Sequence, residues 1–280
     1  MNENIKWGAC AVAVVGLAIG AVVYRDKWWH DKPKPAAKAV AALPAEPAIP
    51  DAPPEPAIKH PVPETAAPEP LPPLDASDKP IQAVVVDLMG VDNVKQWVSP
   101  ENLVRHIVVS IDNLPEQRVA ERIRPLQRVP GEFTVGGSED ALVLDPKNYR
   151  RYDSLVKTIQ SIDTPRLVAN YQRYYPLFQQ SYEGLGHPPQ YFNDRLIQVI
   201  DHLLETPEVR DPIPLSRPLV QYEFADPKLE SLSAGQKLMI RMGGENAGVL
   251  KGKLRELRAA LAATSTAPAP ATDVAPKPGE

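Results

Sequence analysis

The stretch that decides the fold class lies in the centre of the chain, between Asp163 and Gly186, and reads DTPRLVANYQRYYPLFQQSYEGLG. It opens with a capping residue and a proline, which is typical of helix starts because the first turn does not need the N–H that proline lacks. Apolar and aromatic side chains then recur every three or four residues, which predicts one buried helix face. Pro176 predicts a kink in this helix, and Gly186 predicts its end.

Similar signals recur on both sides of this stretch. They predict further helices: one capped by Asp78, one that begins at Ser99, one that begins at Asp145, one capped by Asn193, and two that flank a hinge at Gly243 and Gly244. The last predicted helix carries a narrow apolar stripe made of Leu250, Leu254, Leu257 and Leu261. Such stripes predict helices that pack around a single core.

Two short stretches have the composition of strands. Residues 132–144, EFTVGGSEDALVL, predict a hairpin that turns at Gly136 and Gly137. Residues 218–224, PLVQYEF, predict a short edge strand. The predicted fold class is therefore mainly α, with a single helical domain over residues 75–262 that includes a small β-hairpin.

Residues 1–31 predict an N-terminal membrane anchor, because no charged residue occurs between Trp7 and Tyr24. A helix over 7–24 would span about 27 Å, close to the thickness of a bilayer core. A cleaved signal peptide is the alternative, but charged residues and two tryptophans follow the apolar run instead of a small-residue cleavage site. Gly16 and Gly20 share one helix face at the spacing of membrane-helix dimers, although glycine is also common in such helices without that role.

Residues 32–74 form a spacer rich in proline and alanine, and residues 263–280 form a tail of similar composition. The chain contains 33 prolines, which concentrate in these two segments. Each proline fixes φ and lacks a backbone donor, so the spacer is predicted to be a disordered tether biased towards extended polyproline II. The tail is predicted to be disordered as well.

The charge and cysteine content exclude several classes of function. The net charge of −4 gives no basic footprint for a nucleic-acid partner. Cys10 is the single cysteine, so one chain can form neither a disulfide nor a cysteine zinc site. No pair of histidines has metal-ligand spacing, and no phosphate loop or nucleophile elbow occurs. We therefore expect no metal and no cofactor.

The best candidate for chemistry is a polar cluster on the predicted helix FNDRLIQVIDHLL, residues 192–204. Asp194 and Asp201 are seven residues apart and share a helix face, and His202 follows Asp201. Two carboxylates and an imidazole could perform acid–base catalysis if another group converged on them. The alternative is that Asp194 stabilises the helix N-terminus while the other two form ordinary surface contacts. We favour this alternative, so no catalytic residue is assigned.

Aromatic residues are the second feature, because seven of the nine tyrosines fall between Tyr149 and Tyr191. Their helical spacing favours a core position. They cover more than one narrow stripe, however, so some hydroxyls are expected at the surface. Exposed tyrosine beside arginine suits a protein partner or a glycan. The candidate partner-binding residues are Tyr174, Tyr175, Tyr182, Arg173 and Arg195.

The last predicted helix carries Lys251, Lys253, Arg255 and Arg258 around its leucine stripe. A basic amphipathic helix can lie on anionic lipid. The preferred interpretation is that the leucines pack inward and the cations form a solvated face.

Five stretches carry a resemblance to a known family. They are residues 71–78 (LPPLDASD), 113–133 (NLPEQRVAERIRPLQRVPGEF), 144–156 (LDPKNYRRYDSLV), 192–209 (FNDRLIQVIDHLLETPEV) and 222–247 (YEFADPKLESLSAGQKLMIRMGGENA). Over residues 75–262 the chain resembles an uncharacterised bacterial domain-of-unknown-function family, family 3014. The resemblance implies an anchor, a Pro-rich spacer and a helical domain. The family carries no assigned activity, so the resemblance implies no catalytic residues.

Two functions remain open from the sequence. The favoured one is a non-enzymatic binding or scaffolding domain, tethered to the bacterial inner membrane by a single span. Its expected partners are membrane lipid at the anchor, an envelope protein or cell-wall glycan at the domain, and a second copy through the anchor. The alternative is an envelope hydrolase that uses Asp194, Asp201 or His202. The spacer and the lack of thiols beyond Cys10 favour a periplasmic domain, whereas the basic residues that follow the span favour the cytoplasm.

Overall fold

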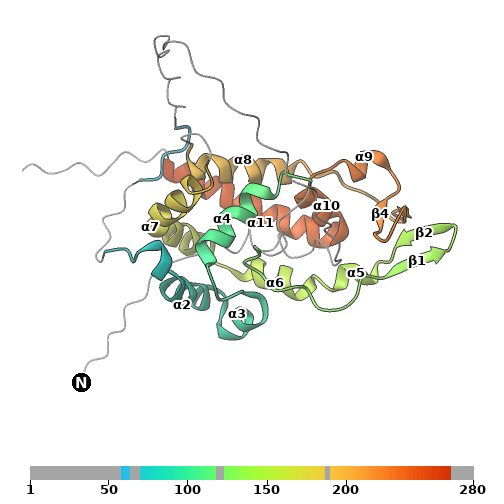
Figure 1. The fold of residues 1–280 in the computed structure, drawn as a ribbon, viewed down its shortest axis with the longest axis horizontal. Helices are drawn as coiled ribbons and strands as arrows, with labels where there is room; N and C mark the ends of the chain where they lie inside the picture. The colour runs from blue at the N-terminus through green and yellow to red at the C-terminus, as the bar shows by residue number, and fades with distance from the viewer. Residues whose placement is uncertain (1–57, 64–69, 118–122, 187–189, 266–280) are drawn as a thin grey trace, which may run out of the picture.

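The computed structural model describes residues 58–63, 70–117, 123–186 and 190–265. The predicted anchor with Gly16 and Gly20, most of the predicted spacer, and the chain after residue 265 lie outside this part. Within the described residues the fold is mainly helical with a small two-stranded hairpin, which confirms the predicted fold class for the domain (Figure 1). None of the helices in the described residues is long and apolar enough to cross a membrane.

The chain order of the elements is as follows. A 3-10 turn, η1 (Leu74–Ala76), precedes the helices α2 (Asp78–Met89), α3 (Val91–Trp97) and α4 (Leu103–Asn113). The hairpin strands β1 (Val135–Ser138) and β2 (Ala141–Leu144) come next, before the helices α5 (Lys147–Arg150), α6 (Asp153–Ser161), α7 (Thr164–Glu183) and α8 (Phe192–Leu204). The strands β3 (Leu215–Ser216) and β4 (Glu223–Phe224) are followed by α9 (Pro227–Glu230), α10 (Ala234–Arg241) and α11 (Gly244–Ser265).

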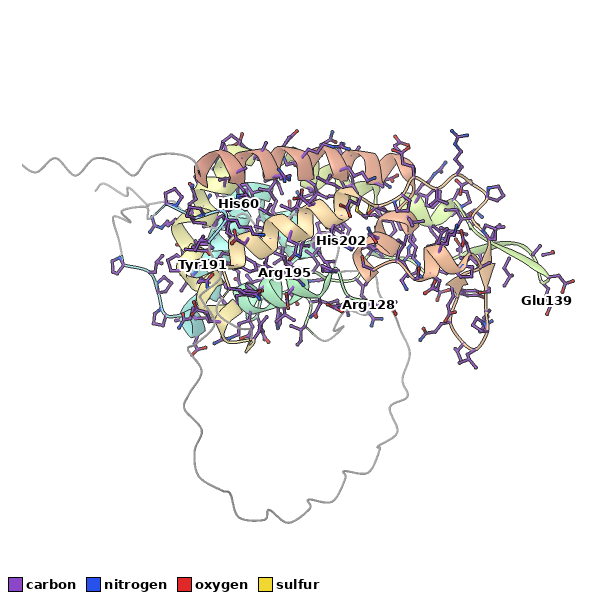
Figure 2. The ribbon with its side chains drawn as sticks, turned by 90° about the horizontal axis from the view of Figure 1, so that it is seen from above. His60, Arg128, Glu139, Tyr191, Arg195 and His202 are labelled. Atoms are coloured by element: carbon purple, nitrogen blue, oxygen red, sulfur yellow. The ribbon has the colours of Figure 1, made fainter. Side chains whose placement is uncertain are left out.

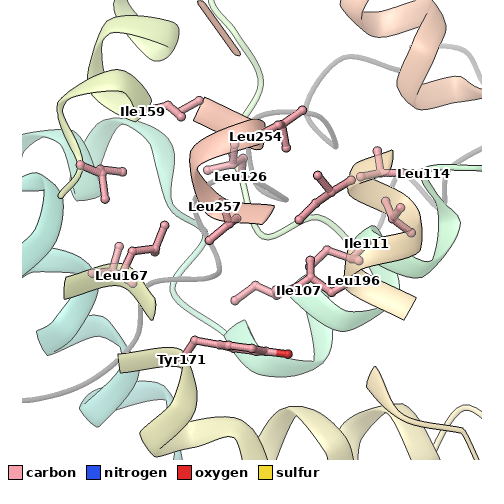
Figure 3. Close-up of a cluster of buried hydrophobic side chains, with 14 of the residues drawn as sticks. Ile107, Ile111, Leu114, Leu126, Ile159, Leu167, Tyr171, Leu196, Leu254 and Leu257 are labelled. Carbon is pink, nitrogen blue, oxygen red and sulfur yellow. The ribbon is translucent and has the colours of Figure 1, made fainter. Parts of the chain in front are cut away.

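The main core lies between the long helices. The last helix, α11, packs against α6, α7 and α8, while α4 packs against α7 and α8 (Figure 1). Figure 3 shows side chains from these helices meeting in one apolar cluster, among them Ile107, Leu167, Leu196 and Leu257. The four leucines predicted to form a stripe on the last helix are all buried in this cluster, so that prediction is confirmed.

The β strands form a separate extension at one end of the molecule (Figure 1). β1 pairs with β2 and β3 pairs with β4, both antiparallel, and a bridge between Val143 and Pro214 joins the two hairpins. A second, smaller apolar cluster, which includes Leu144, Leu215 and Phe224, fills the space between them and α10. The hairpin is thereby fixed to the helical part of the domain.

The turn of the β1–β2 hairpin differs from the prediction. Ser138 pairs with Ala141, so the turn lies at Glu139 and Asp140, whereas the two glycines lie within β1. Gly137 has φ +86°, and a Cβ built there would lie 2.0 Å from the carbonyl oxygen of Ala141. Glycine is therefore needed for a close backbone approach within the strand, and the sequence pattern alone does not distinguish this requirement from that of a turn.

One predicted helix start and one predicted cap are wrong. The predicted start at Ser99 is replaced by α4, which begins at Leu103. α2 begins at Asp78, but Ser77 occupies the capping position and Asp78 does not cap its own helix. Instead, the Asp78 carboxylate accepts hydrogen bonds from the backbone N–H groups of Asn102, at 2.8 Å, and Leu103, at 2.8 Å. These are two of the N–H groups that a helix leaves without an internal partner. A carboxylate from another helix therefore sets the first residue of α4.

The remaining helix boundaries depend on local signals to different degrees. The predicted helix from Asp145 is interrupted, because α5 ends at Arg150 and α6 begins at Asp153. α7 is capped by the Asp163 side chain, which accepts from the N–H of Arg166 at 2.8 Å. It continues through Pro176 and ends at Glu183, earlier than Gly186. The predicted break at Gly243 is confirmed by its φ of +84°.

Candidate functional site

The first turn of α8 brings together the polar side chains that the sequence singled out. Asn193 was predicted to cap this helix, but Tyr191 occupies the capping position and Asn193 lies in the first turn. The backbone N–H of Phe192 is satisfied from α7, because it donates to the side-chain oxygen of Gln179 at 2.8 Å. The side chains of Asn193 and Asp194 are therefore available for contacts outside the helix.

These contacts are made with residues 58–63, the sequence IKHPVP, which belong to the predicted spacer. Asp194 accepts hydrogen bonds from the backbone N–H groups of Lys59, at 3.0 Å, and His60, at 2.8 Å. Asn193 donates from its side-chain amide to the carbonyl oxygen of His60 at 2.9 Å. Both backbone hydrogen-bonding groups of His60 are thus bonded to α8. Figure 2 labels His60 together with Tyr191, Arg195 and His202, which mark the course of α8. Val62 then packs against the main core.

A buried tyrosine fixes the orientation of Asn193. The hydroxyl of Tyr171, on α7, donates to Asn193 Oδ1 at 3.0 Å. Tyr171 is 0 % and Asn193 1 % exposed, so this hydrogen bond is shielded from water. Burial raises the pKa of Tyr171 well above its usual range, so the hydroxyl stays protonated and donates. Because Oδ1 is occupied, the amide group of Asn193 points towards the carbonyl of His60.

Asp194 has the chemistry required for its position. Its two carboxylate oxygens accept two successive N–H groups, and a negative charge in the first turn of a helix is stabilised by the helix dipole. None of these hydrogen bonds involves the side chain of Lys59 or His60. The site recognises a bend of the backbone at Lys59 and His60, which turns two successive N–H groups towards one carboxylate. We call Asp194, Asn193 and Tyr171 the α8 clamp.

Gln179 supports the α8 clamp from α7. Its Oε1 accepts from the Tyr175 hydroxyl at 2.9 Å in addition to the N–H of Phe192. Its Nε2 donates to Glu183 at 2.9 Å and to the carbonyl of Gln190 at 3.0 Å. Burial is the largest cause that raises the pKa of Tyr175, so this hydroxyl also remains a donor at neutral pH. The network holds the start of α8 against α7.

The predicted partner-binding residues do not form one exposed patch. Tyr174 is 3 % and Tyr182 2 % exposed, so both rings belong to the core, whereas Tyr175 is half-buried. Arg173 lies 5.5 Å from the ring centroid of Tyr174. Arg195 pairs with Asp112 on α4, where its Nε donates to the carboxylate at 2.8 Å. These residues mainly stabilise the packing of α7 and α8 on their neighbours.

The predicted catalytic candidates contact three different partners. Asp194 belongs to the α8 clamp, whereas Asp201 forms a two-point ion pair with Arg258 on α11. His202 contacts the hydroxyl of Ser233, the capping residue of α10, at 2.9 Å. The three groups are therefore not brought together around a common point. In the described ranges, no group of three His, Cys, Asp or Glu side chains has an arrangement that could hold a metal ion.

The cations of α11 differ from their predicted role as a solvated face. Lys253 is 6 % exposed and donates to the carbonyl oxygen of Ile162, just after the end of α6. Lys251 donates to the carbonyl of Thr206, just after α8, at 2.6 Å. Both ammonium groups thus bond to carbonyls near the C-terminal ends of neighbouring helices, where positive charge is favourable. Among the four cations, Arg255 has the exposed position that was predicted.

Sequence reasoning missed the captured segment and the role of Gln179. Residues 58–63 had been assigned to the tether by composition, although IKHPVP contains Ile58 and Val62 among the prolines. Pairs of apolar residues in a Pro-rich stretch are the signal that could have indicated docking. Gln179 gives no such signal, because a glutamine on a helix surface is common.

Taken together, these features define a class: a helical domain that binds a bent Pro-containing segment through backbone hydrogen bonds. The family model described as "Protein of unknown function (DUF3014)" matches residues 103–258, which is more than half of the chain. The chain therefore belongs to this family. The match includes α8 with Asn193 and Asp194, and residues 58–63 precede it. No curated protein and no solved structure matches the chain.

Proposed function

We propose that this chain is a membrane-tethered binding or scaffolding domain of the bacterial cell envelope. The observation that carries the proposal is the capture of residues 58–63 by Asp194 and Asn193. A tethered domain needs a defined point at which the tether leaves it. The α8 clamp supplies this point, because it holds the spacer on the domain before the chain continues towards the predicted anchor.

The use of the polar side chains also supports a non-enzymatic function. Catalytic acids and bases need groups that converge on a substrate. Here Asp194 binds a peptide backbone, Asp201 pairs with Arg258, and His202 contacts Ser233. Each candidate for the hydrolase alternative has a contact that stabilises the fold. The proposal therefore keeps binding as the function and assigns no catalytic residue.

The proposed location is the inner membrane, with residues 7–24 as a single span and the domain in the periplasm. A Pro-rich spacer suits this location because anchor and target can lie in separate layers of the envelope. The expected partners are lipid at the span and an envelope protein or cell-wall glycan at the domain. Gly16 and Gly20 add the option of a homodimer through the span.

A reporter fusion tests the topology. A reporter that is active only in the periplasm, fused after Glu280, leaves α11 complete and should give activity. The matching reporter that is active only in the cytoplasm should give none. The opposite pattern would reject the periplasmic location.

A spacer deletion tests whether the domain must reach a partner at a distance from the inner membrane. Removing residues 34–57 leaves the captured segment and the α8 clamp intact. We expect loss of function in a deletion-complementation assay, with unchanged expression and melting curve. A scrambled Pro/Ala/Glu sequence of equal length should restore function. Normal function of the shortened protein would show that reach is not what the spacer supplies.

Substitutions of the candidate acid–base groups test the non-enzymatic function. Asp201→Asn and His202→Gln should each complement the deletion strain when the melting curve is unchanged. Complete loss of complementation by either folded variant would instead support the hydrolase alternative. In a separate experiment, cross-linking in cells should capture a partner with the intact protein and not with a chain that lacks residues 75–262.

A further inference from the structure

We propose that the α8 clamp is a binding site for peptides that bend just before a proline, so that two successive N–H groups point towards one carboxylate, and that the chain's own residues 58–63 are its resident ligand. The inference concerns the clamp itself and does not depend on the membrane location. It goes beyond tethering, because a site whose hydrogen bonds all go to the peptide backbone also accepts the same kind of segment from a second molecule.

The first argument is the type of contact. The α8 clamp accepts the N–H groups of Lys59 and His60 and donates to the carbonyl of His60. These three groups are present in any peptide except where proline removes a donor. The side chain of Lys59 is exposed, so it adds little to recognition. The ligand class is therefore set by backbone conformation.

The second argument is preorganisation of both partners. Tyr171 holds the Asn193 amide in place from inside the core, and the helix start holds Asp194. On the ligand, Pro61 disfavours helical conformations of the preceding His60, and Pro61 and Pro63 each fix φ. Less conformational entropy is lost on binding when both partners are already ordered. Proline on the C-terminal side of the two donors is thus a preference of the site.

The third argument is the way in which the resident segment is connected. Asp194 lies 135 residues from Lys59 in the chain, and six residues, 64–69, separate the captured segment from the described chain that begins at Pro70. The segment is therefore bound as a ligand on a short connection. A short connection gives an effective concentration of about millimolar. A peptide from another molecule must reach this concentration to replace the resident segment.

The test uses the full chain with residues 58–63 replaced by Gly-Pro-Pro-Gly-Ser-Gly (the Pro-Pro variant), which removes both N–H donors and the Val62 side chain of the resident ligand. A fluorescein-labelled peptide of residues 57–63 should bind this variant with saturable anisotropy. Adding Asp194→Ala should weaken binding about tenfold or more, because two hydrogen bonds to a charged acceptor are lost. Adding Asp201→Ala, on the same helix but outside the clamp, is the matched control and should leave binding unchanged.

Two altered peptides test backbone recognition. A peptide with Lys59→Ala should bind as well as the original, whereas a peptide with an N-methyl group on the His60 amide should not bind. Absence of binding to the folded Pro-Pro variant would overturn the proposal. Equal binding with and without Asp194→Ala would overturn it as well.

The wild-type chain provides the same test if the Pro-Pro variant fails to fold. Trypsin cleaves after lysine unless proline follows, so Lys38 and Lys59 are the two tryptic sites between Pro33 and Pro70. The Lys59→Ala peptide contains no tryptic site. At several times the millimolar effective concentration, it should accelerate cleavage after Lys59 and leave cleavage after Lys38 unchanged. No acceleration in that experiment would overturn the proposal.

Discussion

Lys253 on α11 donates a hydrogen bond to the carbonyl oxygen of Ile162, the residue that follows the last turn of α6. The ammonium group also lies 3.2 Å from a carboxylate oxygen of Glu256, which accepts a further hydrogen bond from Thr164 at 3.0 Å. The contact with Lys253 is the first cause of the lowered pKa of Glu256. One buried cation thus joins the end of α6 to the start of α7 and to α11.

This relationship predicts the effect of Lys253→Met. The variant keeps a long apolar side chain but leaves the carbonyl of Ile162 without its donor, so unfolding free energy should fall by about 1–3 kcal/mol. Urea unfolding measures the change. The control is Arg255→Met, two residues away on the exposed side, which should change stability by less than about 0.5 kcal/mol. Equal effects of the two substitutions would contradict the structural role of Lys253.

Tyr171→Phe tests the orientation of the α8 clamp. The substitution keeps the buried ring but removes the donor to Asn193 Oδ1, so it should lower the unfolding free energy by about 1–3 kcal/mol. It should also accelerate tryptic cleavage after Lys59, because the amide of Asn193 is no longer fixed. Tyr191→Phe, at a ring that is 37 % exposed, is the comparison and should affect both readings less. If the Tyr171→Phe chain is destabilised but its rate of cleavage after Lys59 is unchanged, Tyr171 does not orient the clamp.

Two neighbouring glycines give a matched pair in β1. Gly137→Ala places a Cβ against the carbonyl of Ala141 in a backbone conformation unfavourable for alanine, so it should cost about 1–3 kcal/mol and disturb the hairpin. Gly136→Ala meets Val143 at an ordinary distance of 3.4 Å and should be nearly neutral. Amide chemical shifts of β1 and β2, together with melting curves, measure both effects. A neutral Gly137→Ala would contradict the strand register.

His106 on α4 predicts a pH dependence of stability. Burial lowers the pKa of His106 below its ordinary 6.5, and the charges of Asp78 and Glu101 only partly oppose this. The unfolded chain therefore binds the proton more readily than the fold does. The stability linked to this group is complete above pH 6.5 and is lost as the pH falls below 6.5 towards the lower pKa of the folded state. Urea unfolding between pH 7.5 and 5 should show this loss, and His106→Gln should reduce it.

The captured segment predicts the best boundary for an isolated domain. Residues 75–262 should fold without the anchor, with a helical circular dichroism spectrum and a cooperative melt. A piece of residues 58–262 should be more stable by about 2 kcal/mol or more, because it adds the clamp hydrogen bonds and the packing of Val62, Leu71 and Leu74. A coil spectrum of the shorter piece would contradict the predicted domain. Equal melting points would show that residues 58–74 add no stability.

Local signals in the sequence predicted the helical class and several boundaries correctly. Asp163 caps α7, and Gly243 separates α10 from α11. The leucine stripe of α11 is buried as predicted. These features share a physical reason. A cap, a glycine with positive φ and an apolar stripe each act within a few residues, so their effect is readable from neighbouring positions.

Only the tertiary structure decided the partners of the polar side chains. Asp78 reaches the start of α4, Asp194 reaches the backbone of residues 59–60, and Lys253 reaches the end of α6. The sequence correctly places Asp78 and Asp194 at helix starts and Lys253 on a helix rich in cations. The partner lies between 24 and 135 residues away, because packing of the apolar faces sets which backbone groups come within hydrogen-bond distance. The sequence by itself therefore determined which segments fold as helices, whereas the packing of those helices decided that Asp194 binds the Pro-rich segment.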